Sequence, residues 1–353
     1  MAGAFIRGSI RLATFFSNGE KTRQLFALNV QHLMIEILQG NCLDRLKDLE
    51  DQSVNTCITS PPYWGLRDYG EGEQLGLEDT PEEYVENLVN VFREVKRVLR
   101  DDGTVWLNLG DSYVSGNSRY SMREHRILGG GKNENKLGIL QKGAKKDLYG
   151  HPFYKDKDLA GIPWRVAFAL QEADGWYLRQ DIIWHKPVPM PESVKDRCTK
   201  AHEYIFLLSK NAKYYYDNEA IKTPVKNDWG TRDRTNGKYH NEGSGLAPHS
   251  GLEKSYETAN KRSVWTVATK PYSGAHFATY PPDLIKPCVL AGCPEGGTIL
   301  DPFAGSGTTG MVAKQHNRNA VLIELNTDYI KILKQRINPP QTDFFFDERL
   351  AEK

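Results

Sequence analysis

The sequence lacks long apolar runs, closely spaced cysteine pairs and an excess of charge of one sign. No apolar run approaches the ~18–20 residues of a membrane-spanning helix, which excludes an integral membrane protein. The five cysteines include no CxxC pair, and this usage predicts free thiols in a reducing compartment and no metal site. With 46 Lys+Arg against 45 Asp+Glu the formal net charge is +1, and this balance taken alone gives no indication of a nucleic-acid partner.

The chain does contain strands and helices that alternate over residues 34–111, 162–209 and 282–337. The clearest helix pattern spans residues 80–99, where Thr80 is suited to cap a helix and the apolar residues that follow recur at helical spacing. Alternation of this kind predicts an α/β fold with a mostly parallel sheet and helices on both faces. We therefore expect one interrupted catalytic domain over residues 34–338.

Two polar segments, residues 113–158 and 222–275, interrupt this domain and are too long for ordinary connections. The first segment carries ten basic and five acidic residues, a net charge of +5, and the second carries nine basic and five acidic residues, a net charge of +4. Because the whole chain has a net charge of +1, the rest of it carries −8. Residues 1–33 contain Arg and Ser and few acids, which predicts an N-terminal arm and also fits an organellar targeting segment. Residues 339–353 are expected to form a C-terminal tail.

The segment GTILDPFAGSGTTG joins a predicted strand to a predicted helix. Gly305, Gly307 and Gly310 match the dinucleotide pattern GxGxxG, and Glu324 ends the next strand, although a purely structural turn is the alternative for so short a motif. Asp301 would place a carboxylate beside a pyrophosphate, which argues against NAD. S-adenosylmethionine (AdoMet) has an ammonium, a sulfonium and a ribose, so Asp301 near its methionine part and Glu324 on its ribose hydroxyls fit it better.

A second segment, VNTCITSPPYWGLRDYG, leads an apolar strand into Ser60-Pro61-Pro62-Tyr63. The carboxyl end of a strand in an open α/β sheet is a position where ligands bind. The structural alternative for this segment is a rigid Pro-Pro turn with a packed aromatic side chain. The exocyclic amino group of a base is a poor nucleophile, and acceptors for its two hydrogens would favour a pyramidal nitrogen. The Ser60 hydroxyl and the Pro61 carbonyl would be these acceptors, and Tyr63 would stack on a base extruded from the duplex.

With SPPY placed before DPFAGSGTT, the chain resembles the permuted beta class of amino-group DNA methyltransferases over residues 34–338. GNCLDRL, RVLRDDGTVWLNLGDSY and HFATYP match further motifs of that class. The resemblance implies a Rossmann-like methyltransferase fold that uses AdoMet and no metal, with Asp44 at the adenosine and Phe277 and Thr279 at the methionine end. The expected catalytic residues are Ser60, Pro61, Pro62 and Tyr63. The expected cofactor residues are Asp44, Phe277, Thr279, Asp301, Phe303, Gly305, Gly307, Thr308 and Glu324.

Ser-Pro-Pro-Tyr is more typical of N4-cytosine enzymes, so the resemblance implies site-specific methylation of the N4 amino group of a flipped cytosine in DNA. N6-adenine methylation is the alternative, because a seryl oxygen accepts from either amino group. The family places target recognition in the interval 222–275, and we take 113–158 as a DNA-facing loop. C5-cytosine methylation would need a Pro-Cys nucleophile, but Pro287-Cys288 lies in an apolar-faced helix where a buried structural cysteine is expected.

Three residues near these motifs need separate interpretations. Asp111 ends a predicted strand and is expected to be a neighbour of the active site. His185 also ends a strand, and we expect a hydrogen-bonded loop histidine rather than a substrate contact. Arg67 follows the catalytic motif, where a phosphate contact and a surface salt bridge are both open.

The rival functions are methylation of RNA or protein glutamine, which the permuted motif order disfavours, and a decayed DNA-binding protein, which the intact motifs disfavour. DNA is the expected partner, and a homodimer and a partner restriction endonuclease are further expectations. The implied location is cytoplasmic and nucleoid-associated, with an organellar or nuclear one left open. The two basic segments would give a chain of net charge +1 a surface that binds phosphates.

Overall fold

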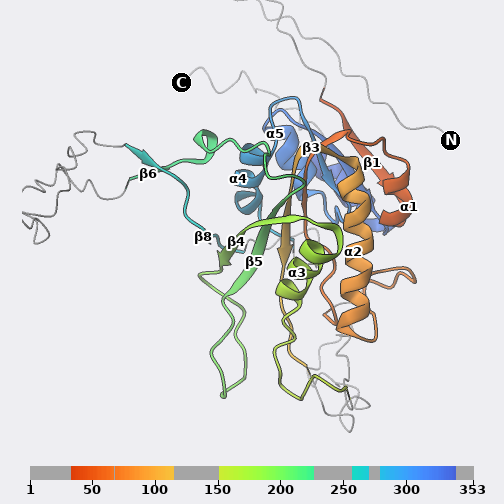
Figure 1. Cartoon of the computed structure of the whole chain (residues 1–353), viewed down its shortest axis with the longest axis vertical. Coiled ribbons are helices and arrows are strands. Elements are labelled where there is room, and N and C mark those ends of the chain that lie inside the picture. Colours follow the sequence, from red (N-terminus) through yellow and green to blue (C-terminus); the bar gives the residue numbers. More distant parts are fainter. Residues whose placement is uncertain (1–32, 67, 115–150, 226–256, 270–278, 339–353) are drawn as a thin grey trace, which may run out of the picture.

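The structure is a computed structural model that describes residues 33–66, 68–114, 151–225, 257–269 and 279–338 (Figure 1). The strands of its main sheet are β1 (Ile35–Gln39), β2 (Val54–Thr59), β3 (Leu99–Leu109), β4 (Tyr177–His185), β5 (His202–Ser209), β8 (Val264–Thr266), β9 (Thr298–Asp301) and β10 (Asn319–Glu324). Their order across this eight-stranded sheet is β1-β10-β9-β2-β3-β5-β4-β8.

Neighbouring strands of this sheet run parallel except at β5, which is antiparallel to both β3 and β4. The mostly parallel sheet is thus confirmed. The exception matters for function, because the first residues of β5 lie at the edge where the parallel strands end. This edge receives loops from β2, β3, β4 and β9, and it is where ligands bind in open α/β sheets.

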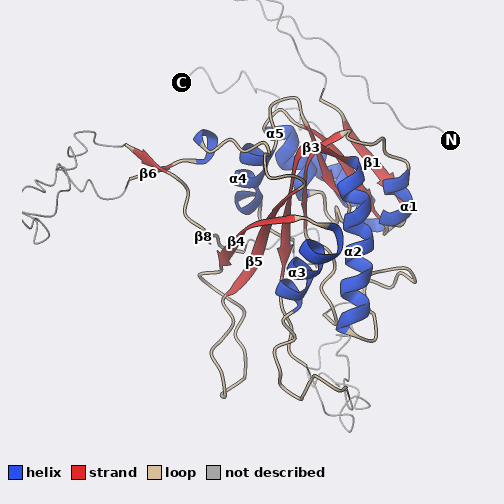
Figure 2. Cartoon of the chain, in the orientation of Figure 1, coloured by secondary structure: helices blue, strands red, loops and turns tan. Residues whose placement is uncertain are grey.

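Helices cover both faces of the sheet, as the alternation predicts (Figure 2). The helices α1 (Cys42–Lys47), α2 (Pro81–Val98) and α3 (Ile162–Asp174) share one apolar core with the sheet. A second core on the other face contains α4 (Pro282–Gly292), α5 (Thr308–Gln315) and α6 (Thr327–Ile337). None of the helices in the described ranges is long and apolar enough to cross a membrane.

Helix α2 follows from its local sequence. The Thr80 hydroxyl accepts a hydrogen bond from the Glu83 amide at 3.2 Å, and Pro81 occupies the first turn, where it costs no hydrogen bond. Tyr84, Leu88, Val91, Phe92 and Val95 are buried along one stripe of the helix. The predicted helix is therefore confirmed, with bounds one residue inside the expected ones.

The two predicted insertions are described only at their ends. At the first, the Val114 amide donates to Asp158 and the Lys157 amide donates to Val114, at 2.9 and 3.0 Å, so the chain leaves and returns at one point. At the second, β6 (Thr223–Pro224) follows a short 3₁₀ helix (Glu219–Ile221) and pairs with β7 (Thr258–Ala259). β8 adds an edge strand to the main sheet, with Trp265 buried. Most of both insertions, the N-terminal arm before residue 33 and the C-terminal tail lie outside the described residues.

Candidate active site

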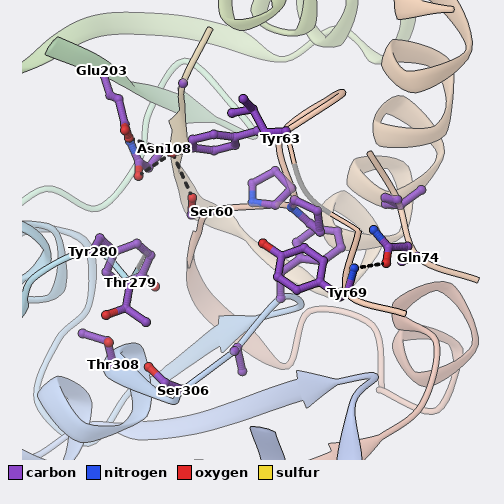
Figure 3. A pocket seen from close by; sticks show the side chains of 18 of the residues that line it. Ser60, Tyr63, Tyr69, Gln74, Asn108, Glu203, Thr279, Tyr280, Ser306 and Thr308 are labelled. Atoms are coloured by element: carbon purple, nitrogen blue, oxygen red, sulfur yellow. Dashed lines mark hydrogen bonds between the residues drawn. The ribbon is translucent and has the colours of Figure 1, made fainter. Parts of the chain in front are cut away.

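A cavity of about 1040 Å³ lies at the sheet edge where β2, β3 and β9 end (Figure 3). One part of its wall is the Ser-Pro-Pro-Tyr segment, and another is the glycine-rich turn with the end of β10. The two motifs that the sequence analysis singled out therefore share one cavity. Sites for a single small ligand span about 300–1000 Å³, so this cavity has room for a cofactor together with a base.

Most of the predicted site residues line this cavity. They are Ser60, Pro61, Pro62, Tyr63, Asp111, Thr279, Phe303, Gly305, Thr308 and Glu324. Asp44, Asp301 and Gly307 are described but are not among the lining residues. Phe277 and Arg67 lie outside the described residues.

Asp301 is buried below the cavity and joins the two motif strands. Its carboxylate accepts hydrogen bonds from the hydroxyls of Thr59 at 2.7 Å, Thr309 at 2.5 Å and Tyr280 at 3.0 Å, and from the Phe303 amide at 3.1 Å. Burial raises the pKa of Asp301, and the four donors oppose that effect. The sequence analysis expected this carboxylate beside the methionine part of the cofactor. The structure instead places it where it holds β2, β9 and α5 together.

The three glycines of the GxGxxG pattern have different surroundings. Gly305 lines the cavity at φ +50°, and the nearest atom to an added Cβ is 4.0 Å away. Gly307 precedes α5 at φ +79°, and a Cβ there would meet Leu333 of α6 at 2.6 Å. A Cβ on Gly310 would meet Leu322 at 2.4 Å. Thus only the first glycine lines the cavity, and the other two allow close packing of α5.

Glu324 ends β10 with its carboxylate fixed at the cavity wall. One oxygen accepts from the Gly305 amide at 2.7 Å and the other from the Asn326 amide at 2.8 Å. Burial raises the pKa of Glu324. A carboxylate has about four acceptor positions, so this one can also receive two ribose hydroxyls. Tyr69 and Tyr329 line the same part of the cavity, edge to face with their ring centroids 6.3 Å apart. This set of groups fits the ribose and the adenine of AdoMet.

The structure does not bring Asp44 to this end of the cavity. Its side chain is 63 % exposed and pairs with Lys47 on the same turn of α1 at 3.4 Å. Asn41, Cys42 and Leu43, just before it, do line the cavity. Helix α1 begins at Cys42, so residue 44 falls on a different side of the first turn from the residues that face the cavity.

The Ser-Pro-Pro-Tyr segment is held rigidly against α2 and the loop before it. The Tyr84 hydroxyl donates to the Pro62 carbonyl at 2.7 Å, and the indole of the buried Trp64 donates to the Glu78 carbonyl at 3.0 Å. The Tyr63 ring lies against Gly110, where an added Cβ would be 2.5 Å from the ring. The Ser-Pro-Pro-Tyr segment is thus a rigid Pro-Pro turn, as the structural alternative expected, and it also forms part of the cavity wall.

Two lining residues that the sequence analysis missed contact this motif. Glu203 accepts a hydrogen bond from the Tyr63 hydroxyl at 2.7 Å, and Asn108 lies 3.2 Å from the same hydroxyl. Figure 3 shows both above Ser60, with Thr279 and Tyr280 below it. Asn108 is the residue before the last of β3, the strand whose end drew attention to Asp111, so its position was a usable signal. Glu203 is the second residue of β5, and an expectation of parallel strands directs attention to strand ends rather than strand beginnings.

The other individually considered residues agree with their interpretations. Asp111 lines the cavity 3.9 Å from Lys200, and burial raises the pKa of Asp111 and lowers that of Lys200. His185 lies within hydrogen-bond distance of the Thr266 hydroxyl, 3.2 Å away, and is not among the lining residues. Cys288 is buried in α4, and burial raises its pKa, so it is a structural thiol rather than a nucleophile.

Comparisons with known proteins agree with this geometry. The chain matches the DNA methylase family of N6 and N4 methyltransferases over residues 54–335. It is 46 % identical to the Type II methyltransferase M.Cfr9I of Citrobacter freundii, across 87 % of this chain and 89 % of that protein. It is 44 % identical to M.SmaI of Serratia marcescens, across 86 % of this chain and 90 % of that protein.

Two solved structures share the fold. The cytosine-N4-specific PvuII DNA methyltransferase aligns with a TM-score of 0.57 at 17 % identity, covering 87 % of each chain. A putative DNA modification methylase of Thermus thermophilus, solved with S-adenosyl-L-methionine, aligns with a TM-score of 0.50 at 22 % identity, covering 85 % of this chain and 93 % of that one. The chain therefore belongs to the DNA methylase family of N6 and N4 methyltransferases and is an AdoMet-dependent DNA methyltransferase.

Proposed function

We propose that this methyltransferase acts on the exocyclic N4 amino group of a cytosine extruded from DNA. AdoMet, when bound, supplies an electrophilic methyl group. Phe303, Gly305, Thr308 and Glu324 would hold it, with Thr279 and the Tyr69–Tyr329 pair. The Ser-Pro-Pro-Tyr wall would receive the base, with the Tyr63 ring stacked on it.

One observation carries the role of Ser60 as an acceptor for an amino group: the direction of the hydrogen bond between Ser60 and Tyr63. Ser60 Oγ donates to the Tyr63 hydroxyl at 3.3 Å, because the single phenolic hydrogen is directed to Glu203. The lone pairs of Ser60 are then left for a donor in the cavity, such as an amino group. Acceptance of its hydrogens by Ser60 and by the Pro61 carbonyl favours a pyramidal nitrogen. No covalent intermediate is needed, and placement of the two reactants supplies most of the rate.

Nucleoside mass spectrometry after incubation of DNA with the protein and AdoMet tests the proposed base. We expect N4-methylcytosine. N6-methyladenine as the sole product would show that the alternative within the family is correct, and 5-methylcytosine would overturn the role of the Ser-Pro-Pro-Tyr segment. Labelled-methyl transfer to DNA, RNA and protein in parallel would separate the remaining rivals.

The proposal includes the expected recognition regions and partners. Residues 222–275 would select the target sequence and 113–158 would contact the duplex, since both carry a net positive charge.

The relatives named above are Type II methyltransferases. We therefore propose that methylation by this chain protects DNA from an endonuclease of the same specificity. Digestion of methylated DNA with a panel of endonucleases tests this role, and light scattering tests the expected dimer.

A further inference from the structure

The Tyr63 hydroxyl lies in the middle of a chain of polar groups that leads from Ser60 into the sheet. Ser60 donates to Tyr63, and Tyr63 donates to Glu203 Oε2 at 2.7 Å. Tyr63 has only one hydroxyl hydrogen, and the shorter contact with a charged acceptor holds it in preference to Asn108 Oδ1 at 3.2 Å. The hydrogen bonds of this series are therefore all donated in one direction, from the cavity toward Glu203.

Glu203 is surrounded by hydrogen-bond donors. Lys186 forms an ion pair with one carboxylate oxygen, and the other oxygen receives Tyr63 OH and Asn108 Nδ2, the latter at 3.3 Å. Asn108 Nδ2 also donates to the Tyr204 carbonyl at 3.0 Å, which fixes the orientation of the amide. Burial, followed by the charge of Glu203, raises the pKa of Tyr63. The phenol therefore keeps its hydrogen until another proton replaces it.

Methylation of an amino group requires an acceptor for one proton. When the nitrogen forms its bond to the methyl group, it uses its lone pair and becomes positively charged while still bearing two hydrogens. One hydrogen must leave as a proton, and the cationic nitrogen is a far stronger acid than a carboxylic acid. Of the hydrogen-bonded groups just described, Ser60 would lie nearest to the amino nitrogen. A hydroxyl can keep an added proton only if it releases its own.

We propose that Glu203 is the final acceptor of this proton and acts through Tyr63 and Ser60. The nitrogen gives its proton to Ser60 Oγ, Ser60 passes its hydroxyl hydrogen to the Tyr63 oxygen, and Tyr63 passes its own to Glu203. At the end both hydroxyls are neutral, the methylated nitrogen is neutral and Glu203 is a carboxylic acid. Release of that proton to solvent restores the carboxylate. This inference rests on the proposed function, because it needs the amino group beside Ser60.

Asp111 also lines this cavity, but its hydrogen bonds lead elsewhere. It accepts from the amides of Ser112 and Ile162, at 3.0 and 3.1 Å, and lies 3.9 Å from Lys200. Its described partners therefore connect it to the start of α3 rather than to the Ser-Pro-Pro-Tyr segment. Among the described residues, the hydrogen-bonded route from Ser60 ends at Glu203 and Asn108, and only Glu203 can take up a proton.

The test measures the single-turnover rate of methyl transfer and the affinity for AdoMet in Glu203→Gln, Tyr63→Phe and the double variant. Glu295→Gln is the matched control, because Glu295 is 73 % exposed and pairs with Arg318 at the opposite end of β9. Positioned proton acceptors contribute about 10²–10⁴-fold to rates, so we expect Glu203→Gln to lose at least about tenfold. AdoMet affinity should change by less than about twofold, and Glu295→Gln should match the unchanged protein.

The double variant separates action through Tyr63 from an independent structural effect of Glu203. If Glu203 acts through Tyr63, the double variant is no slower than Tyr63→Phe alone. Two losses that multiply, or a Glu203→Gln variant as fast as the unchanged protein, would overturn the inference. In both cases amino methylation by the unchanged protein would still stand. Absence of any amino methylation by the unchanged protein would overturn the proposed function and this inference with it.

Discussion

Thr59 Oγ1 donates a hydrogen bond of 2.7 Å to Asp301 Oδ1, across a sequence separation of 242 residues. Thr59 is the last residue of β2 and Asp301 the last of β9, and these strands are neighbours in the sheet. The residue after Thr59 is Ser60, and the glycine-rich turn begins after Asp301. This buried bond therefore fixes the distance between the part of the cavity that would hold the base and the part that would hold AdoMet.

The proposed acceptor role predicts that Ser60→Ala binds AdoMet normally and loses most of its turnover. The substitution removes one oxygen and leaves Pro61, Pro62 and the Tyr84–Pro62 hydrogen bond in place. Loss of an acceptor that acts only as the reaction proceeds should lower the rate about 10²-fold or more. Calorimetric AdoMet titration and labelled-methyl transfer measure the two quantities. Unchanged turnover would contradict the assigned role.

Gly110→Ala tests the position of the Tyr63 ring. The new Cβ would be 2.5 Å from the ring, so the Tyr63 ring must shift from its present position. We expect methyl transfer to fall by at least about tenfold, because catalytic geometry tolerates displacements of well under 1 Å. Gly72→Ala is the control, since an added Cβ at Gly72 has no neighbour within 4 Å. Equal activity of the two variants would show that the contact between Gly110 and Tyr63 is not needed.

Two of the three acids that the sequence analysis assigned to the cofactor, Glu324 and Asp44, should differ in their effect on AdoMet binding. Glu324→Gln places an amide NH₂ against either the Gly305 or the Asn326 amide and removes acceptors from the cavity. We expect affinity to fall by about tenfold, which corresponds to about 1.4 kcal/mol. Asp44→Asn changes an exposed side chain paired with Lys47 and should have little effect. A larger loss for Asp44→Asn would favour the role implied by the family resemblance over the structure.

The raised pKa of Asp301 predicts that the contribution of this carboxyl group to the free energy of unfolding falls as pH rises through the acid range. Between the ordinary pKa of an aspartate and the raised one, the folded protein keeps a proton that the unfolded chain releases, so rising pH favours unfolding. Asp301→Asn has no such proton. The free energy of unfolding of the variant minus that of the unchanged protein should therefore increase with pH, by about 1.4 kcal/mol per pH unit within this window. Urea titrations at several pH values measure the difference, and a difference that decreases with pH would contradict the prediction.

The segregated charge predicts strong salt dependence of DNA binding. The segments 113–158 and 222–275 hold a net +9 on a chain of net charge +1, so phosphate contacts should be concentrated there. Affinity for a DNA duplex should fall linearly with salt on logarithmic axes. Fluorescence anisotropy between about 50 and 200 mM salt measures the slope. An affinity that does not change over this range would contradict the prediction.

Much of the architecture follows from local sequence. The cap at Thr80 and the apolar stripe of α2 depend on residues a few positions apart, so the helix was predictable almost to its bounds. The alternation of apolar strands and helices likewise specified a sheet covered on both faces. The antiparallel direction of β5 was not predictable in this way, because it depends on how β4 and β5 pair rather than on their residues alone.

Local sequence specifies the chemistry of the site, since Ser60-Pro61-Pro62-Tyr63 and the glycine-rich turn are each a contiguous segment. How these groups are used depends on contacts between segments that are distant in the sequence. Asp301 is in the interior because four donors converge on it, and Gly307 is held against Leu333. Glu203 reaches Tyr63 because one strand runs against its neighbours. Hydrogen bonds and packing across more than a hundred residues depend on strand order and direction, which a local motif does not specify.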